Sequence, residues 1–165
     1  MAQIDLKNTT FRLKDGTTPT PKELEIKIGE GNLTYSEKQT MEYVLDRGLL
    51  DIVSEGDQVP MDISFDFVWE FLKADGGTIP TVEEFLKRSG PAAAYVSTTS
   101  DQCQPYSVDI EIEQDQPCGG VKREIITLPD FRWEEINHDA SAGSVAVTGK
   151  CNATKATIIR AVQTT

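Results

Sequence analysis

The sequence predicts a mainly β protein, an antiparallel β-sandwich or barrel with one short α-helix at its flank. Apolar and polar residues alternate in several short segments separated by Gly, Pro and Asp, which is typical of half-buried strands and turns. Only one short segment carries helix-capping signals. The 165 residues, 38% of them hydrophobic, suffice for one core, so we expect one domain over residues 1–165.

The first elements are short strands. A strand is expected at Thr10–Leu13, before the loop that contains the TTPTP sequence at residues 17–21. Residues 23–28 alternate Glu or Lys with Leu or Ile, and the alternation resumes at Leu33 after a turn or bulge at residues 29–31. This pattern predicts two strands joined by a tight connection.

Residues 38–57 form an excursion that is compatible with either a hairpin or a partial helix, because Gly48 and the Glu55-Gly56-Asp57 turn interrupt its apolar spacing. Its many apolar residues must be buried against the domain's own core or against a neighbouring subunit. These residues are Met41, Tyr43, Val44, Leu45, Leu49, Leu50, Ile52 and Val53.

A strand at residues 61–67 follows, with apolar residues at the odd positions and Asp62, Ser64 and Asp66 between them. The next stretch, VWEFLKADGG at residues 68–77, fits strand and helix periods equally well. Acidic alternation recurs at residues 108–113 and, less regularly, at 23–28. We interpret these acidic faces as the outer, solvated side of an antiparallel sheet.

The clearest helix is expected at residues 82–89. Thr81 and Glu84 have the spacing of a capping box, Pro80 precedes them, and Gly90 provides the stop. From residue 93 on, the pattern predicts strands only. They are expected within residues 93–99, 105–115, 122–136, 143–150 and 153–163.

The balance of 27 acidic and 16 basic residues gives a formal net charge of −11, which argues against non-specific binding to nucleic-acid phosphates. We find no apolar run of membrane-spanning length and no signal-peptide pattern. The expectation is a protein of a soluble compartment with no membrane partner.

Catalytic groups are few. His138 is the only histidine and lies in a polar INHDASAG turn, where a solvated loop histidine is expected. No nucleophile motif, phosphate-binding loop or metal-ligand spacing is found, so we predict that the protein is not an enzyme and has no cofactor or metal. Cys103 and Cys118 could form a disulfide under oxidising conditions, although three buried thiols are the simpler interpretation.

Two long stretches resemble the tail tube (major tail) proteins of long-tailed bacteriophages. The first is residues 31–67, with its strand, excursion, EGD turn and alternating strand. The second is residues 103–153, in particular ITLPDFRWEEI at residues 126–136 and the GSVAVTGK strand after it. The resemblance covers most of the chain and is one of strands and turns.

The resemblance implies a tail-tube-like sandwich or barrel protomer that forms six-membered rings, stacked into a hollow tube through which the phage genome leaves. Its implied partners are other copies of itself, the terminator, distal tail, tape measure and possibly sheath proteins, and DNA in passage. The implied location is the virion tail, assembled in the host cytoplasm. In the family the excursion packs on the next ring, which would place residues 38–57 at the stacking interface.

Within such a tube, we expect Asp62, Ser64 and Asp66 to face the lumen and to repel the DNA phosphates. The alternative function is a monomeric β-sandwich module that binds carbohydrate or a receptor. It would expose Trp69 or Trp133 for stacking on sugar, and its carboxylates would bind calcium or lie in solvent.

Overall fold

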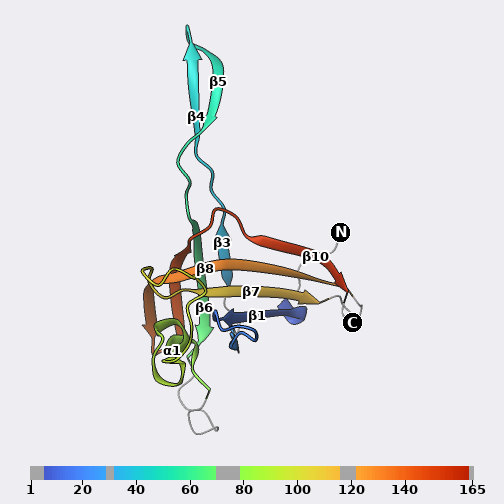
Figure 1. The fold of residues 1–165 in the computed structure, drawn as a ribbon, viewed down its shortest axis with the longest axis vertical. Helices are drawn as coiled ribbons and strands as arrows, with labels where there is room; N and C mark the ends of the chain where they lie inside the picture. The colour runs from blue at the N-terminus through green and yellow to red at the C-terminus, as the bar shows by residue number, and fades with distance from the viewer. Residues whose placement is uncertain (1–5, 29–31, 70–78, 116–121, 164–165) are drawn as a thin grey trace.

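The computed structural model describes residues 6–28, 32–69, 79–115 and 122–163. As predicted, it is mainly β, its sheets are antiparallel, and it contains one short α-helix (Figure 1). A 3₁₀ turn at Leu6–Asn8 opens the described chain. The strands are β1 Thr9–Lys14, β2 Glu23–Glu25, β3 Leu33–Ser36, β4 Met41–Asp46, β5 Leu49–Glu55, β6 Met61–Val68, β7 Val108–Asp115, β8 Lys122–Asp139, β9 Ser144–Cys151 and β10 Thr157–Gln163.

The main sheet has eight strands in the order β2-β1-β7-β8-β9-β6-β3, with β10 beside β8. The long strand β8 carries two sets of partners. Its first half pairs with β7 and β10 and its second half pairs with β9. The change of partners occurs next to Asp130, which has a positive φ of 52°. Because of this, β8 joins the two groups of strands that cross in Figure 1.

Two backbone hydrogen bonds bring the ends of this sheet together. The Ile26 N–H donates to the Phe11 carbonyl of β1, and the Lys27 carbonyl accepts from the Val68 N–H of β6, both at 2.8 Å. Residues 26 and 27 thereby bridge β1 and β6, and β2 is shorter than the expected strand at 23–28. The expected turn at 29–31 lies outside the described residues, and β2 and β3 pair with different strands.

The core lies where the inward sides of the strands meet, and it confirms the alternation in β6. Met61, Ile63, Phe65 and Phe67 are buried, with exposed fractions of 0 to 4%. The core also includes inward residues of β1, β7, β8 and β9, among them Leu13, Ile110, Leu128, Phe131, Val145 and Val147. Of the stretch at residues 68–77, which fits strand and helix periods equally well, residues 70–77 lie outside the part that the structure describes. Strand β6 continues to Val68.

Helix α1, Val82–Lys87, has the predicted capping box. The Thr81 hydroxyl accepts from the Glu84 N–H, and the Glu84 carboxylate accepts from the Thr81 N–H. The helix ends two residues earlier than expected, because Arg88 adopts the left-handed conformation with φ 53°. Phe85 packs into the core and meets Tyr95 edge-on, with ring centroids 5.1 Å apart.

The strand predicted at residues 93–99 is wrong. Gly90–Ala92 forms a 3₁₀ turn with Pro91 at its start, and an irregular segment follows it. This segment makes hydrogen bonds to nearby side chains and does not pair with a neighbouring strand. The Ser97 and Thr98 hydroxyls both lie within hydrogen-bond distance of the Ser107 hydroxyl. The remaining strands predicted after residue 105 are present.

Strands β4 and β5 form a separate two-stranded sheet, a hairpin that projects from the rest of the molecule (Figure 1). The hairpin interpretation of residues 38–57 is therefore correct and the partial helix is wrong. Arg47 and Gly48, with φ 52° and 83°, form the turn, and two successive positive φ angles are those of the type I′ turn that suits a tight hairpin.

Candidate assembly surfaces

The projecting hairpin, β4 and β5, carries the largest set of exposed apolar side chains in the described chain. Every residue of both strands is exposed. Of the two alternatives for these side chains, burial against the domain's own core is wrong, because the hairpin extends away from the core. The exposed fractions are Met41 40%, Tyr43 65%, Val44 52%, Leu45 59%, Leu49 74%, Leu50 76%, Ile52 58% and Val53 56%.

The root of the hairpin is held to the body by polar contacts. The Gly56 N–H donates to the Thr40 carbonyl at 2.8 Å, which closes the two arms of the hairpin at their base. Lys38 Nζ lies 2.6 Å from a carboxylate oxygen of Asp62, which joins one arm to β6. The pair of Lys38 and Asp62 thus connects the root of the hairpin to β6.

Asp62, Ser64 and Asp66 lie on the face of β6 opposite the core, as the alternation predicts. Register places them beside polar or small residues: Ser36 and Lys150 beside Asp62, and Thr34 and Thr148 beside Ser64. Lys38 and, at 3.7 Å, Lys150 pair with Asp62, and the hydrogen bond from Lys38 lowers the pKa of Asp62. The face is thus polar, and one of its two carboxylates is neutralised locally.

The acidic face of β7 differs from the expected solvated surface, because Glu111 and Glu113 are buried at 8% and 6% exposure. Glu113 contacts Arg12 at 2.6 Å and Arg123 at 2.8 Å. Burial alone would raise the pKa of Glu113, but the hydrogen bonds from these two arginines outweigh it and lower the pKa. Lys14 contacts Glu111 at 2.6 Å. Flanking strands therefore cover and neutralise these carboxylates.

Two further exposed apolar side chains lie where β6 ends, away from the hairpin. Val68 and Trp69 are 42% and 39% exposed. The Trp69 N–H donates to the Gly143 carbonyl at 2.9 Å. The centroids of the Trp69 and His138 rings lie 5.1 Å apart. His138 Nε2 lies 3.0 Å from a carboxylate oxygen of Glu83 on α1. His138 thus lies on strand β8 and contacts α1, whereas a solvated loop histidine was expected.

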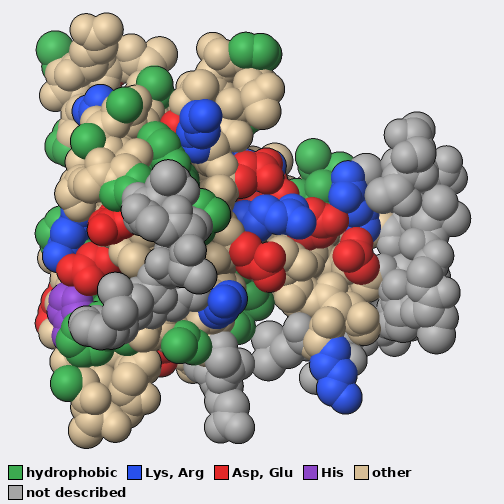
Figure 2. All heavy atoms as spheres, turned by 90° about the horizontal axis from the view of Figure 1, so that it is seen from below, with side chains coloured by type: hydrophobic (Ala, Val, Ile, Leu, Met, Phe, Trp, Pro, Cys, Tyr) green, Lys and Arg blue, Asp and Glu red, His purple; other side chains and the backbone are tan. Residues whose placement is uncertain are grey.

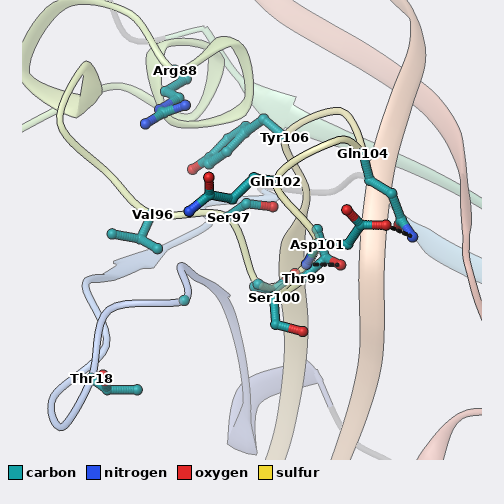
Figure 3. Close-up of a pocket in the computed structure, with 12 residues that line it drawn as sticks. Thr18, Arg88, Val96, Ser97, Thr99, Ser100, Asp101, Gln102, Gln104 and Tyr106 are labelled. Atoms are coloured by element: carbon teal, nitrogen blue, oxygen red, sulfur yellow. Dashed lines mark hydrogen bonds between the residues drawn. The ribbon is translucent and has the colours of Figure 1, made fainter.

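A polar pocket of about 590 Å³ is lined by the segment of residues 96–106, by Arg88 at the end of α1, and by Gly16 and Thr18 of the loop after β1 (Figure 3). The Arg88 guanidinium lies over the Tyr106 ring, 5.5 Å from its centroid. Burial raises the pKa of Tyr106, and its hydroxyl has no hydrogen-bond partner among the described residues. The rest of the lining is mainly hydroxyl and amide side chains, with Asp101 as its carboxylate.

The thiols do not follow the expectation of three buried cysteines, since Cys103 is exposed. Cys151 is buried in the core, and burial together with Asp109 and Asp130 raises its pKa to about 12. Cys118 lies outside the described residues, so its pairing with Cys103 stays a prediction.

The described residues provide little catalytic chemistry. Within the described ranges, no three His, Cys, Asp or Glu side chains are grouped closely enough to hold a metal ion. None of the helices described has the length and apolar character needed to cross a membrane. The contacts of His138 with Glu83 and Trp69 are not part of any nucleophile arrangement that the structure describes.

Sequence reasoning missed the ion pairs between β1, β7 and β8 and the cluster at the end of β6. Arg12 and Lys14 do alternate with the buried residues of β1, which was a usable signal for a charged face. Their pairing with Glu113 and Glu111 depends on strand order, which the sequence does not reveal. Trp69, Glu83 and His138 come from three separate elements, so no local pattern joins them.

No family model and no curated protein matches the chain. A chain from a cryo-EM structure of the PVC sheath/tube terminator, of an extracellular contractile injection system in the extended state, aligns with a TM-score of 0.56 at 10% identity, covering 96% of this chain and 98% of that one. A chain from the six-fold symmetrised baseplate of the anti-feeding prophage (AFP) aligns with a TM-score of 0.47 at 8% identity, covering 97% and 98%. At such low identity, the first likeness establishes a common fold over nearly the whole length of both chains.

Proposed function

We propose that the chain is a structural protein of a phage-tail-like particle. Six copies form a ring, and rings stack into a hollow tail tube that conducts DNA. The observation that carries this proposal is the hairpin β4–β5, whose eight large apolar side chains are all exposed. A solvated apolar surface of this kind is typical of a protein–protein interface, and the shared fold with a contractile injection system chain supports a place in such an assembly.

The physical argument begins with the stability of the hairpin. An isolated two-stranded hairpin is marginally stable in water, and β4 and β5 pair only with each other among the described strands. Burying one large aliphatic side chain completely stabilises by about 1.5–3 kcal/mol. Packing the hairpin on another subunit would therefore stabilise both the hairpin and the contact between rings.

Lateral contacts between protomers in the ring would use free strand edges. Within the described residues, β3 ends the strand order, and its outer edge pairs with no other strand. Unpaired edges invite pairing with another chain, and closing the ring would remove them.

The charge of the chain suits a conduit. Six copies carry six times −11, or −66, and a negative wall repels phosphates and prevents the counterion release that drives non-specific DNA binding. We place Asp62, Ser64 and Asp66 on the lumen side, because they lie on the polar face of β6. Lys38 and Lys150 pair with Asp62, so the charges of the two lysines balance those of Asp62 and Asp66, and we expect this face to hold DNA phosphates only weakly.

Electron microscopy of the purified protein at increasing concentration tests the assembly. We expect rings and stacked tubes with a central hole, and light scattering that rises with concentration. A protein that stays monomeric at all concentrations contradicts the proposal.

The lumen assignment needs its own test. We expect the Asp62→Lys/Asp66→Lys variant to assemble but to retain DNA at low salt and to eject it slowly. Ser64→Asn is the matched control on the same strand face. Unchanged DNA retention and ejection in assembled Lys variants would contradict the lumen position.

The second candidate function is a monomeric module that binds carbohydrate, and one observation favours it: Trp69 and Trp133 are both 39% exposed. A monomeric module would leave the apolar hairpin without a binding partner. A glycan array, with Trp133→Ala as the negative control, tests it on the monomeric protein.

A further inference from the structure

We infer that the pocket at the C-terminal end of α1 is a binding site for a sugar acid, a small ligand that carries one carboxylate and several hydroxyl groups. The Arg88 guanidinium would hold the carboxylate, and the hydroxyl and amide side chains of residues 97–104 would hold the ligand's hydroxyl groups. The site goes beyond the proposed structural function and does not depend on it, because none of the described residues that line the pocket belongs to the hairpin, β3 or β6.

Arg88 differs from the basic side chains of β1 and β8, because none of the described carboxylates forms an ion pair with it. Arg12 and Arg123 share Glu113, and Figure 2 shows basic and acidic side chains intermixed across the middle of the face seen from below. Arg88 lies instead over the Tyr106 ring at the side of the pocket. Its planar guanidinium is therefore available for a bidentate pair with the carboxylate of a ligand.

The Tyr106 hydroxyl is a second group without a partner. It is buried, and no hydrogen bond joins it to any of the described residues. Burial raises the pKa of Tyr106, so the hydroxyl keeps its proton and can donate it. Figure 3 shows this hydroxyl directed to the side of the pocket where Gln102 lies, and the exposed side chains of Arg88 and Gln102 can turn to admit a ligand. Because an unpaired buried hydroxyl is costly, a ligand oxygen that accepts from it is favoured.

The opposite side of the pocket limits the class of ligand. Asp101 and Gln104 lie there, across from Arg88 (Figure 3). The Asp101 carboxylate accepts from the Gln104 amide at 3.3 Å and from the Cys103 N–H at 2.9 Å. A carboxylate repels a second anionic group but accepts hydrogen bonds from hydroxyl groups. A ligand with one anionic end and one hydroxyl-bearing end therefore fits this pocket better than phosphate, a dicarboxylic acid or an acidic peptide.

The size and the lining of the pocket favour a small polar ligand. Its volume of about 590 Å³ lies within the range of about 300–1,000 Å³ that is typical of small-molecule sites. Val96 is the one large aliphatic side chain among the described lining residues, and most of the others are Ser, Thr or Gln. An apolar ligand would gain little from burial here, whereas the hydroxyl groups of a sugar would find donors and acceptors.

The wall formed by residues 96–98 is fixed before binding. The Gly16 N–H donates to the Val96 carbonyl at 2.8 Å, and the buried Asp15 carboxylate accepts from the Val96 N–H at 3.3 Å. A Cβ at position 16 would lie 2.0 Å from the Ser97 carbonyl oxygen, so this close approach requires glycine. A wall held in this way loses little conformational entropy when a ligand binds.

Ligand-observed NMR on the full chain tests the site. Saturation-transfer titrations use D-glucuronate and D-galacturonate, the neutral sugars D-glucose and D-galactose, and inorganic phosphate, all at one ionic strength. We expect saturable binding of at least one uronate, binding about tenfold or more weaker for its neutral sugar, and no displacement of the uronate by an equal concentration of phosphate. The inference is overturned if neither uronate binds, if acid and neutral sugar bind equally, or if phosphate displaces the uronate.

Substitutions assign the binding to particular groups. Arg88→Gln should weaken uronate binding about tenfold or more. Arg47→Gln makes the same change of net charge at the exposed hairpin turn and should leave binding unchanged. Unchanged binding in Arg88→Gln, or an equal loss in Arg47→Gln, contradicts the site. Because these titrations do not require assembly, their failure is distinct from a failure to form rings and tubes.

Tyr106→Phe provides a readout that a structural role would not give. It should weaken uronate binding, yet leave the unfolding midpoint of the unliganded protein unchanged or higher, because it removes a buried hydroxyl that has no partner among the described residues. A lower midpoint together with unchanged binding would overturn the assignment of Tyr106 to the site.

Discussion

Strand β6 and the hairpin β4–β5 are adjacent in sequence and show the same abundance of apolar residues, yet the fold treats them in opposite ways. In β6 every odd position is buried at 4% exposure or less, while in the hairpin every residue is exposed. Alternation thus identifies a strand, and it does not tell which molecule supplies the apolar partner. In β6 the partner is the chain's own core, and in the hairpin we propose that it is a second copy.

The largest contrast should come from matched truncations in the two regions. Phe65→Ala empties a fully buried site between Phe67 and Phe131 and should cost about 3–5 kcal/mol in the free energy of unfolding. Tyr43→Ala, at 65% exposure, should change it by less than about 0.5 kcal/mol in the monomer. Denaturant unfolding of the dilute protein measures both, and equal costs would remove the distinction between core and hairpin.

The ion pairs of β7 provide a pH-dependent prediction for the body. The pKa of Glu113 is lowered in the folded state, so its contribution is fully present above its unfolded pKa of about 4.3 and is lost as the pH falls through the folded value. Stability should therefore drop below about pH 4.5. Glu113→Gln should cost about 1.5–3 kcal/mol at pH 7 and flatten this acid limb, as followed by thermal unfolding between pH 3 and 7.

Asp109 provides the internal check on that sign. Burial raises its pKa, so in the folded protein it favours the protonated form and opposes the trend of Glu113. Asp109→Asn should therefore steepen the loss of stability in acid, and a flatter profile would show that the assignment of the two carboxylates is wrong. Because the Asp109 carboxylate accepts from the Asp130 N–H, this variant is compared with wild type by the slope with pH rather than by absolute stability.

The hairpin turn offers a smaller and more local effect. Gly48 has φ 83°, a conformation that a β-branched residue adopts at a cost of about 1–2 kcal/mol. Gly48→Val should leave the unfolding of the body unchanged and weaken assembly, as seen by light scattering. Gly143, with φ 64° in the turn before β9, is the matched control, and its valine variant should affect the body instead.

The thiols give the smallest effect and a direct comparison of exposed and buried sites. Cys103 is exposed, whereas Cys151 is buried and its pKa is raised to about 12. Iodoacetamide at pH 8 should modify Cys103 within minutes and Cys151 only on unfolding. Peptide mass spectrometry reads both sites, and rapid modification of Cys151 in the folded protein would contradict its place in the core.

Sequence reasoning predicted the parts of the fold that depend on local patterns. The mainly antiparallel β class, the inward residues of β6 and the Thr81 capping box are set by alternation and by short-range hydrogen bonds. The strand predicted at residues 93–99 is absent, because the hydroxyl groups of this segment bond to Ser107 and the segment does not pair with a neighbouring strand. That competition depends on tertiary placement, which propensity does not include.

The candidate surfaces were predictable only in part. The apolar excess of residues 38–57 and the outward side chains of β6 were visible in the sequence. The neutralisation of Asp62 by Lys38 and Lys150, and the burial of Glu111 and Glu113, depend on which strands become neighbours. The contacts of Trp69 with His138 and of His138 with Glu83 depend on the meeting of β6, β8 and α1, which are far apart in the chain.

Side-by-side electron microscopy of wild type and a Leu45→Thr/Leu50→Thr variant tests the role of the hairpin most directly. Threonine keeps the strand preference and the cross-strand pair but removes apolar surface from the hairpin. Val96→Thr, at a body position of 48% exposure, is the control. We predict long tubes from wild type and Val96→Thr and isolated rings from the hairpin variant. Tubes of equal length from all three proteins would contradict the account.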